Sequence, residues 1–212
     1  AAFALPVLQK IKYAQDLPPR ALVLVPTKEL VLQVHEVFET LSKYTDLRCL
    51  ALYGGVGPKT QLEGLEKGAD ILIATPGRFL DLYLRGGIET KKIKTLVLDE
   101  CDRMMDMGFM PQLRNILEVI PSKRQNLLFS ATFPDRVEKL SGEFLLWPTK
   151  IEVSPQATPV ATVIQRKTPV PNIRTKLNYV AHLLENEYNE ERALVFVRTK
   201  EQAEQISKYL ER

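Results

Sequence analysis

The chain has 212 residues, of which 45% are hydrophobic and 26% are charged, and its formal net charge is +3. This length and composition suit a globular protein with one full domain and part of another. No apolar run approaches the roughly 18 residues of a membrane span. The two cysteines, Cys49 and Cys101, lie far apart in apolar stretches, as free thiols in a reducing compartment do. These features predict a cytoplasmic protein, and the small net charge alone gives little support for a polyanion partner.

Short apolar runs alternate along the chain with segments of helical periodicity. The runs are continuous in their apolar character, which is typical of strands buried on both faces of a sheet. This alternation predicts an α/β fold with a parallel sheet covered by helices on both faces. The predicted strands cover residues 21–27, 49–55, 70–76, 95–100, 126–132 and 150–154, and the predicted helices cover residues 28–44, 77–85, 110–120 and 134–146.

The pattern changes after Ser154. Residues 155–172 contain four prolines, a composition typical of a linker. A helix at about 174–187, a strand at 193–199 and a helix at about 200–211 are predicted beyond it, too few residues for an independent α/β domain. We therefore predict a first domain over residues 1–153, a linker over 154–172 and the beginning of a second domain over 173–212.

A polar cluster ends each of the first five predicted strands. Because parallel strands end at the same edge of a sheet, where ligands of open α/β sheets bind, we expect the five clusters to lie together. They are Pro26-Thr27, Gly54-Gly55, Thr75-Pro76-Gly77-Arg78, Asp99-Glu100 and Ser130-Ala131-Thr132.

Three acids, Asp99, Glu100 and Asp102, directly follow the apolar run 96–98. An Asp at such a strand end is the Walker B arrangement, in which the carboxylate holds the Mg²⁺ of a nucleotide. The adjacent Glu is placed to orient or deprotonate a water molecule. The alternative is that Asp99 or Asp102 only caps the next helix. Cys101 is expected to be a packing residue, because one Cys beside carboxylates with no nearby His makes no zinc site.

The stretch GGVGPKT, residues 54–60, resembles a phosphate-binding loop but departs from it at one position. The loop needs Gly immediately before the Lys, so that backbone N–H groups can wrap the phosphates. Pro58 stands there instead, which removes an N–H donor and fixes φ. We therefore assign no phosphate loop to this stretch, and no other match occurs in the chain.

Two of the clusters read as helix N-termini, where free N–H groups attract a phosphate. Arg78 is placed to add a charge-assisted contact in one of them. In the other, Thr27 is placed to cap the helix that follows, which leaves Lys28 for a second phosphate. Taken singly, each is better explained as an ordinary helix cap.

Together the clusters resemble the motifs of DEAD-box ATP-dependent RNA helicases, in both order and spacing. The strings LDECDRMMDMGF (98–109) and LLFSATFP (127–134) are the most specific, and the linker SPQATPV is most similar to the RhlE-like bacterial branch. The matching strings are PTKEL (26–30) for motif Ia, GG (54–55) for the GG motif, TPGR (75–78) for motif Ib, DECD (99–102) for motif II, SAT (130–132) for motif III and LVFVRT (194–199) for the start of motif IV.

The resemblance implies two RecA-like domains that close around ATP-Mg²⁺ and single-stranded RNA. It implies that Asp99 holds Mg²⁺ and that Glu100 positions the hydrolytic water. It also implies that Ser130 and Thr132, whose hydroxyls we expect to bond the acids of the neighbouring strand, act with Asp102 to link the nucleotide state to domain closure.

The RNA contacts implied by the resemblance go to the sugar–phosphate backbone. Such contacts carry little base information, so recognition should be largely independent of sequence. The implied RNA-binding residues are Pro26, Thr27, Lys28, Gly54, Gly55, Thr75, Pro76, Gly77, Arg78, Arg198 and Thr199.

Three departures from the family pattern qualify this reading. Cys101 replaces the usual Ala of the tetrad and should be tolerated. Lys28 replaces the usual Arg, trading a planar fork for a point charge, so that phosphate contact is expected to be weaker. The Gly-Lys-Thr of motif I would precede Ala1, and motifs V and VI would follow Arg212, so the chain as given is expected to be catalytically incomplete.

The leading hypothesis is an ATP-dependent RNA helicase. The alternative from another class is a non-catalytic RNA-binding or scaffolding module that uses the same edge without turnover. A helicase that acts on DNA is less well supported, because the motif II string belongs to the RNA-acting group.

Overall fold

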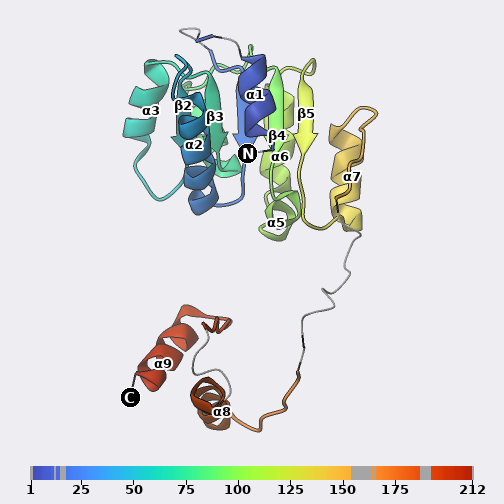
Figure 1. Ribbon diagram of the computed structural model, residues 1–212. Coiled ribbons are helices and arrows are strands. Elements are labelled where there is room, and N and C mark those ends of the chain that lie inside the picture. Colours follow the sequence, from blue (N-terminus) through green and yellow to red (C-terminus); the bar gives the residue numbers. More distant parts are fainter. Residues whose placement is uncertain are drawn as a thin grey trace. The chain divides into compact units, whose positions relative to one another are not determined.

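Five parallel strands form the sheet that organises the first part of the chain (Figure 1). The computed structural model describes residues 2–11, 13–14, 18–153, 164, 166–186 and 192–211. It divides the chain into two units, Ala1–Ala157 and Thr158–Arg212, and each is considered by itself. Most of the predicted linker lies outside the described residues, and so do the last residue of the predicted strand 150–154 and the last of the predicted helix 174–187.

The first five predicted strands are confirmed, although each is shorter than its apolar run. The first unit also contains three helices for which no range was predicted, α1, α3 and α5. In chain order its elements are α1 (Ala4–Lys10), β1 (Ala21–Leu24), α2 (Lys28–Ser42), β2 (Cys49–Leu52), α3 (Pro58–Glu66), β3 (Ile71–Ala74), α4 (Pro76–Leu84), β4 (Thr95–Leu98), α5 (Cys101–Asp106), α6 (Met110–Val119), β5 (Gln125–Leu128) and α7 (Asp135–Phe144).

The strands lie in the order β2-β3-β1-β4-β5, and every neighbouring pair is parallel. Leu24 at the end of β1 pairs with Ala74 at the end of β3 and with Leu98 at the end of β4. The strands therefore end level with one another. The predicted parallel sheet, typical of a RecA-like domain, is confirmed.

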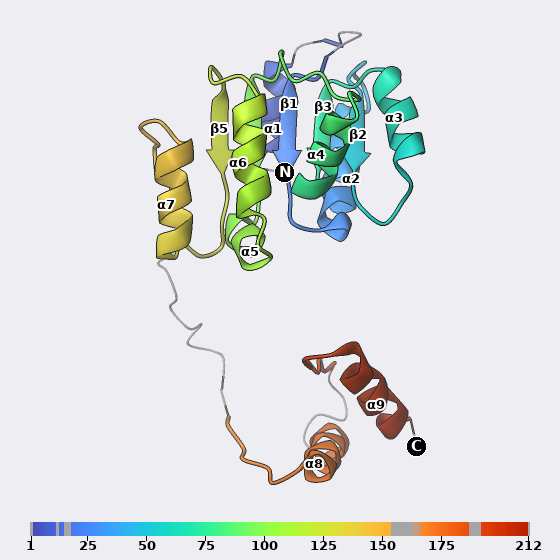
Figure 2. The ribbon, with the colours of Figure 1, turned by 180° about the vertical axis from the view of Figure 1, so that it is seen from behind.

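Helices cover both faces of this sheet, and alternate strand residues point into two separate apolar layers. Figure 1 shows α1 and α2 in front of the sheet, and Figure 2, from behind, shows α4 and α6 on the opposite face. Leu22 and Leu24 of β1 pack in the layer of α4 and α6, whereas Val23 packs in the layer of α1 and α2. All four residues of β1, β3 and β4 are buried, which explains why these strands are apolar at every position except Thr95.

Two predicted strands are wrong. Residues 150–153 form no strand, and the side chains of Ile151 and Val153 are 84% and 95% exposed. Residues 193–199 likewise form no strand, although Leu194 and Phe196 are apolar. A run of strand-forming residues needs a neighbouring strand to complete its hydrogen bonds. The described part of the chain has no strand beyond β5 in the first unit, and none at all in the second.

The described part of the second unit contains two helices, α8 (Ile173–Asn186) and α9 (Lys200–Leu210). The hydroxyl of Tyr209 on α9 donates a hydrogen bond to the side-chain oxygen of Asn178 on α8. Neither helix has a buried residue. In both units, the helices described are too short or too polar to cross a bilayer. The assignment of a second RecA-like domain to this region stays a prediction.

One buried carboxylate joins the amino ends of three neighbouring strands. Asp70, which precedes β3, is 1% exposed, and its carboxylate accepts hydrogen bonds from the guanidinium of Arg20 and from the backbone N–H of Arg48, the latter at 3.0 Å. Arg20 precedes β1 and Arg48 precedes β2. The backbone carbonyl of Asp70 also accepts from the N–H of Arg20 at 2.8 Å. Asp70 therefore fixes where β1, β2 and β3 begin relative to one another.

We predict that Asp70→Ala lowers the free energy of unfolding of the chain by about 3 kcal/mol, because it leaves the partly buried Arg20 guanidinium without its carboxylate. The measurement is urea unfolding followed by circular dichroism. Asp46→Ala is the matched control, since Asp46 is exposed, and it should change the stability by less than about 0.5 kcal/mol. Equal effects of the two substitutions would show that Asp70 does not organise the sheet.

Candidate functional site at the carboxyl edge of the sheet

The polar clusters that follow the strands lie along one edge of the sheet, as the sequence predicted. Backbone hydrogen bonds continue one residue past the strand ends. The N–H of Asp99 donates to the carbonyl of Leu24 at 3.0 Å, and the N–H of Thr75 donates to that of Leu52 at 3.0 Å. The N–H of Phe129 donates to the carbonyl of Leu98 at 2.8 Å. The segments that follow the five strands therefore begin at the same level along this edge of the sheet.

Asp99 is a partly buried carboxylate at the end of β4. Its Oδ1 accepts a hydrogen bond from the N–H of Glu100 at 3.0 Å, which uses one of its two oxygens. Burial raises the pKa of Asp99, the hydrogen bond from Glu100 opposes that change, and the neighbouring Glu100 charge adds to it. A cation that approaches a carboxylate with a raised pKa stabilises its charged form.

Glu100 has a strained backbone, with φ +50° and ψ +51° in the left-handed region. A residue with a side chain loses roughly 1–2 kcal/mol in this conformation. The next residue is held in place, because the N–H of Cys101 donates to the carbonyl of Phe129 at 3.1 Å. Such strain tends to persist where the surrounding structure fixes a functional side chain. Glu100 occupies the N-cap position of α5, so neither Asp99 nor Asp102 is the helix cap that the alternative reading required.

Asp102 connects the end of β4 to the end of β5. Its Oδ2 accepts hydrogen bonds from the Thr132 hydroxyl at 2.7 Å and from the Thr132 N–H at 3.0 Å. The Ser130 hydroxyl accepts from the Asp102 N–H at 3.2 Å and donates to the Thr132 carbonyl at 2.6 Å. Burial raises the pKa of Asp102, but the hydrogen bonds from Thr132, Ser130 and Arg103 together outweigh burial and hold this pKa below its usual value. The expected contact between these hydroxyls and Asp102 is present.

Three glycines leave the backbone of the edge open. A Cβ added to Gly54, Gly55 or Gly77 would meet no atom within 4 Å. Gly55 has φ +85°, a conformation that favours glycine. A bulky ligand can therefore approach the peptide groups of these two clusters without a side chain in the way.

The two helix N-termini are formed as predicted. The Thr27 hydroxyl accepts from the N–H of Leu30 at 3.2 Å and caps α2. Lys28, exposed at the start of α2, has its ammonium 5.2 Å from the centre of the Tyr53 ring. Thr75 is the N-cap residue of α4, although its side chain makes no capping bond.

Arg78 differs from expectation, because its guanidinium is bonded within the protein. Nε donates to the carbonyl of Tyr53 at 3.0 Å, Nη2 donates to that of Val56, and Nη1 lies 3.2 Å from Oδ2 of Asp81. The Gln61 amide donates to the same Tyr53 carbonyl at 3.1 Å. Sequence reasoning missed Tyr53, Gln61 and Asp81. The spacing of Arg78 and Asp81, three apart on one helix, was the only signal that pointed to any of them.

Of the four remaining predicted RNA-binding residues, two belong to the first unit and two to the second. Pro26 and Pro76 are buried and shape the turns that carry their neighbours. Arg198 and Thr199 belong to the second unit, where the Thr199 hydroxyl accepts from the N–H of Gln202 at 3.3 Å and caps α9. Their roles stay predictions.

The edge offers few metal ligands of its own. Among the described residues, no group of three or more His, Cys, Asp or Glu side chains is arranged to hold a metal ion. Asp99, with Glu100 beside it, therefore fits an ion that takes most of its ligands from water and from a phosphate. Mg²⁺ binds proteins in this way.

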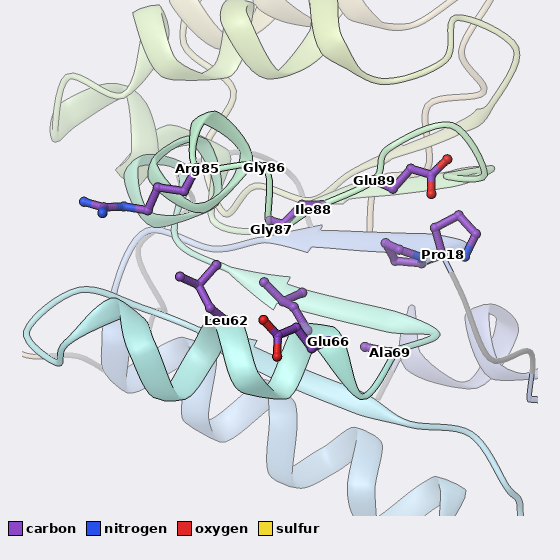
Figure 3. Close-up of a pocket in the computed structure, with 11 residues that line it drawn as sticks. Pro18, Leu62, Glu66, Ala69, Arg85, Gly86, Gly87, Ile88 and Glu89 are labelled. Atoms are coloured by element: carbon purple, nitrogen blue, oxygen red, sulfur yellow. The ribbon is translucent and has the colours of Figure 1, made fainter.

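A cavity of about 320 Å³ lies at the opposite edge of the sheet (Figure 3). Its walls come from the carboxyl ends of α3 and α4 and from Pro18, which precedes β1. Leu62 and Ile88 contribute apolar surface, and Glu66, Arg85 and Glu89 contribute charged groups. None of the clusters described above contributes to it. The candidate site is therefore an open edge and not this cavity.

Comparison with known proteins connects this edge to a family. A family model described as DEAD/DEAH box helicase matches residues 1–140. The chain is 41% identical over 190 residues to the ATP-dependent RNA helicase RhlB of Hamiltonella defensa, which covers 89% of this chain and 44% of that relative. It is 40% identical over 204 residues to DEAD-box ATP-dependent RNA helicase 52A of Oryza sativa, covering 91% of this chain and 34% of that relative.

A third relative is the ATP-dependent RNA helicase DeaD of Mycobacterium tuberculosis. It is 39% identical over 211 residues, which cover 99% of this chain and 37% of DeaD. The chain thus spans less than half the length of these three relatives. The narrower resemblance to an RhlE-like branch stays a prediction.

We predict that Glu100→Gly raises the free energy of unfolding by about 1 kcal/mol, because glycine adopts the left-handed backbone without strain. Urea unfolding of the chain measures the change. Glu118→Gly is the control, because Glu118 is an exposed residue of the regular helix α6, where glycine should lower the stability by about 1 kcal/mol. A loss of stability in Glu100→Gly would show that the backbone at this position is not strained.

We also predict a pH-dependent effect of Thr132→Val. The pKa of Asp102 is lowered in the folded chain, so its bonds to Thr132 stabilise the fold above the unfolded pKa of about 3.9 and lose this effect as the pH falls through the folded value. Thr132→Val should therefore destabilise the chain by about 1 kcal/mol at pH 7 and by less near pH 3. In an Asp102→Asn background this pH dependence should vanish. If it remains, another group is responsible.

Proposed function

Because the chain belongs to the DEAD/DEAH box helicase family, we propose that it acts within an ATP-dependent RNA helicase and uses the carboxyl edge of its sheet for both ATP and RNA. The observation that carries this proposal is the common level of the strand ends. It brings the acidic cluster 99–102 and the hydroxyl cluster 130–132 together at one side of β1, and the glycine clusters 54–55 and 75–78 at the other. Nucleotide chemistry and backbone contacts to RNA are thereby carried on one rigid sheet.

In the proposed reaction each acid at the carboxyl edge has a different role. Asp99 holds Mg²⁺, which when bound offsets the negative charge of the phosphates. Glu100, fixed by its constrained backbone, orients the attacking water and accepts its proton. Asp102, Ser130 and Thr132 keep the ends of β4 and β5 together, so a displacement at the acids is passed to the segment that leads into α7.

RNA is proposed to lie over the open glycines and the N-termini of α2 and α4. The groups available there are backbone N–H groups and the charge of Lys28, which suit phosphates and not base edges. Recognition should therefore be largely independent of sequence. Strand separation would follow from bending one strand as two domains close on it, without directional movement along the RNA.

We further propose that the protein works in the cytoplasm as a reduced protein. Burial raises the pKa of the Cys49 and Cys101 thiols to about 12, which keeps both protonated and unreactive. Cys101 is fully buried beside the acids, in agreement with a packing role.

The test is Glu100→Gln in the full-length protein. The amide keeps the shape of the side chain but cannot accept a proton, so RNA-stimulated ATP hydrolysis should fall by about 100-fold or more while ATP affinity changes by less than about threefold. Phosphate release and equilibrium nucleotide binding measure the two quantities. Glu63→Gln, an exposed residue of α3, is the control and should leave both unchanged.

Two results would contradict the proposal. Turnover by Glu100→Gln at the wild-type rate would remove Glu100 from the reaction. RNA binding by the wild-type protein with no RNA-stimulated turnover would favour the alternative, a non-catalytic RNA-binding module.

A further inference from the structure

The guanidinium of Arg78 is committed to groups of the protein at all three nitrogens. Its partners are the carbonyls of Tyr53 and Val56 and the carboxylate of Asp81. The side chain is 10% exposed. An arginine that binds phosphate needs its fork of N–H groups directed at the ligand, whereas here the fork is directed at the loop after β2.

The charge of Arg78 is also partly offset by a carboxylate that it shares with Arg85. Asp81 lies 3.2 Å from Nη1 of Arg78, and its other oxygen accepts from Nε of Arg85 at 2.8 Å. Three of the five N–H groups of the guanidinium are used in this way, and a phosphate could take the place of any of these three bonds only by displacing Asp81 or one of the two carbonyls. The Tyr53 carbonyl is partly buried, so breaking its bond to Arg78 would offset part of the gain from a new phosphate contact.

The two carbonyls bound by Arg78 lie on either side of the glycine pair. Tyr53 precedes Gly54 and Val56 follows Gly55, so one side chain holds both ends of the open turn. The Gln61 amide supports the first end through a second bond to the Tyr53 carbonyl. Without these bonds the two glycines would sample many conformations, and fixing them on a ligand would cost conformational entropy.

The same contacts connect three of the clusters at the edge. Arg78 is on α4, the carbonyls belong to the loop after β2, and the ring of Tyr53 lies under the ammonium of Lys28 at the start of α2. Motion of the loop would therefore shift the glycines relative to Lys28 and to the N-terminus of α4.

We infer that Arg78 is a positioning residue, which holds residues 53–56 in the shape that receives the RNA backbone and makes no phosphate contact of its own. The inference rests on the proposed function for its ligand. It replaces the direct contact that the sequence resemblance implied for this residue. It also assigns supporting roles to Gln61 and Asp81.

The test compares affinity for a single-stranded oligouridine with its salt dependence, in the full-length protein. Each phosphate contact to a single strand contributes about 0.7 to the slope of log K against log salt. Arg78→Ala should weaken binding about tenfold at every salt concentration and leave the slope unchanged. Arg78→Lys should be almost as weak, because an ammonium cannot hold two carbonyls and a carboxylate in one plane.

Two control variants make the comparison specific. Lys28→Ala should reduce the slope by about 0.7, as expected of a residue that contacts a phosphate. Arg85→Ala removes the other partner of Asp81 without touching the loop, and should change the affinity by less than twofold. A slope that falls by about 0.7 in Arg78→Ala and recovers in Arg78→Lys would overturn the inference.

A second measurement needs no RNA and separates this inference from the proposed function. Backbone order parameters from NMR relaxation of the chain of residues 1–212 should fall from about 0.85 to below about 0.6 at residues 54–57 in Arg78→Ala and Arg78→Lys, but not in Arg85→Ala. The order parameter of Ile116, in the core of α6, should stay unchanged in all three. Unchanged order parameters at residues 54–57 would overturn the inference. A wild-type protein that binds no RNA but shows this pattern would contradict only the proposed function.

Discussion

The common level of the strand ends is the constraint on which the rest of the molecule depends. At the amino edge, the buried Asp70 carboxylate joins the starts of β1, β2 and β3 through Arg20 and Arg48. At the carboxyl edge, backbone bonds such as Asp99 to Leu24 continue the ladder beyond the strands. A slip of one residue in any strand would turn its buried side chains to the opposite face and displace its polar cluster. Packing and site geometry are therefore fixed by the same register.

The fixed strand ends allow the site to hold Glu100 in a strained backbone conformation. Glu100 keeps a left-handed backbone because Cys101 is bonded to Phe129 on one side and Asp102 to Thr132 just beyond. A single hydrogen bond contributes only about 1 kcal/mol, comparable to the strain, so several bonds together are needed to hold the residue. The acidic cluster and the hydroxyl cluster are thus one structural unit, and neither would keep its geometry without the other.

The sequence predicted those features that depend on local pattern. Continuous apolar runs identified β1, β3 and β4, and a Thr before a helical segment identified the cap of α2. The prediction from sequence failed where a structural feature depends on a strand or residue that is distant in the chain. The strand predicted at 150–154 lacks a neighbouring strand among the described residues, and nothing around Arg78 in the sequence shows that the carbonyls of Tyr53 and Val56 lie within its reach. The left-handed backbone of Glu100 likewise arises from contacts with the end of β5.

The contact of Lys28 with Tyr53 changes how the replacement of the family's usual Arg by Lys at position 28 is interpreted. A planar fork would suit a fixed bidentate contact, whereas an ammonium on a flexible stem can move between partners. The Lys28 ammonium lies over the ring of Tyr53 at 5.2 Å, an interaction of roughly 0.5–1 kcal/mol at an exposed site. It can be given up for a phosphate at small cost, while Arg78 and Gln61 keep the backbone of Tyr53 in place. At this edge Lys28 supplies a charge that can move, whereas Arg78 and Gln61 hold the loop of residues 53–56 in place. Different side chains therefore provide the affinity for a polyanion and the shape that receives it.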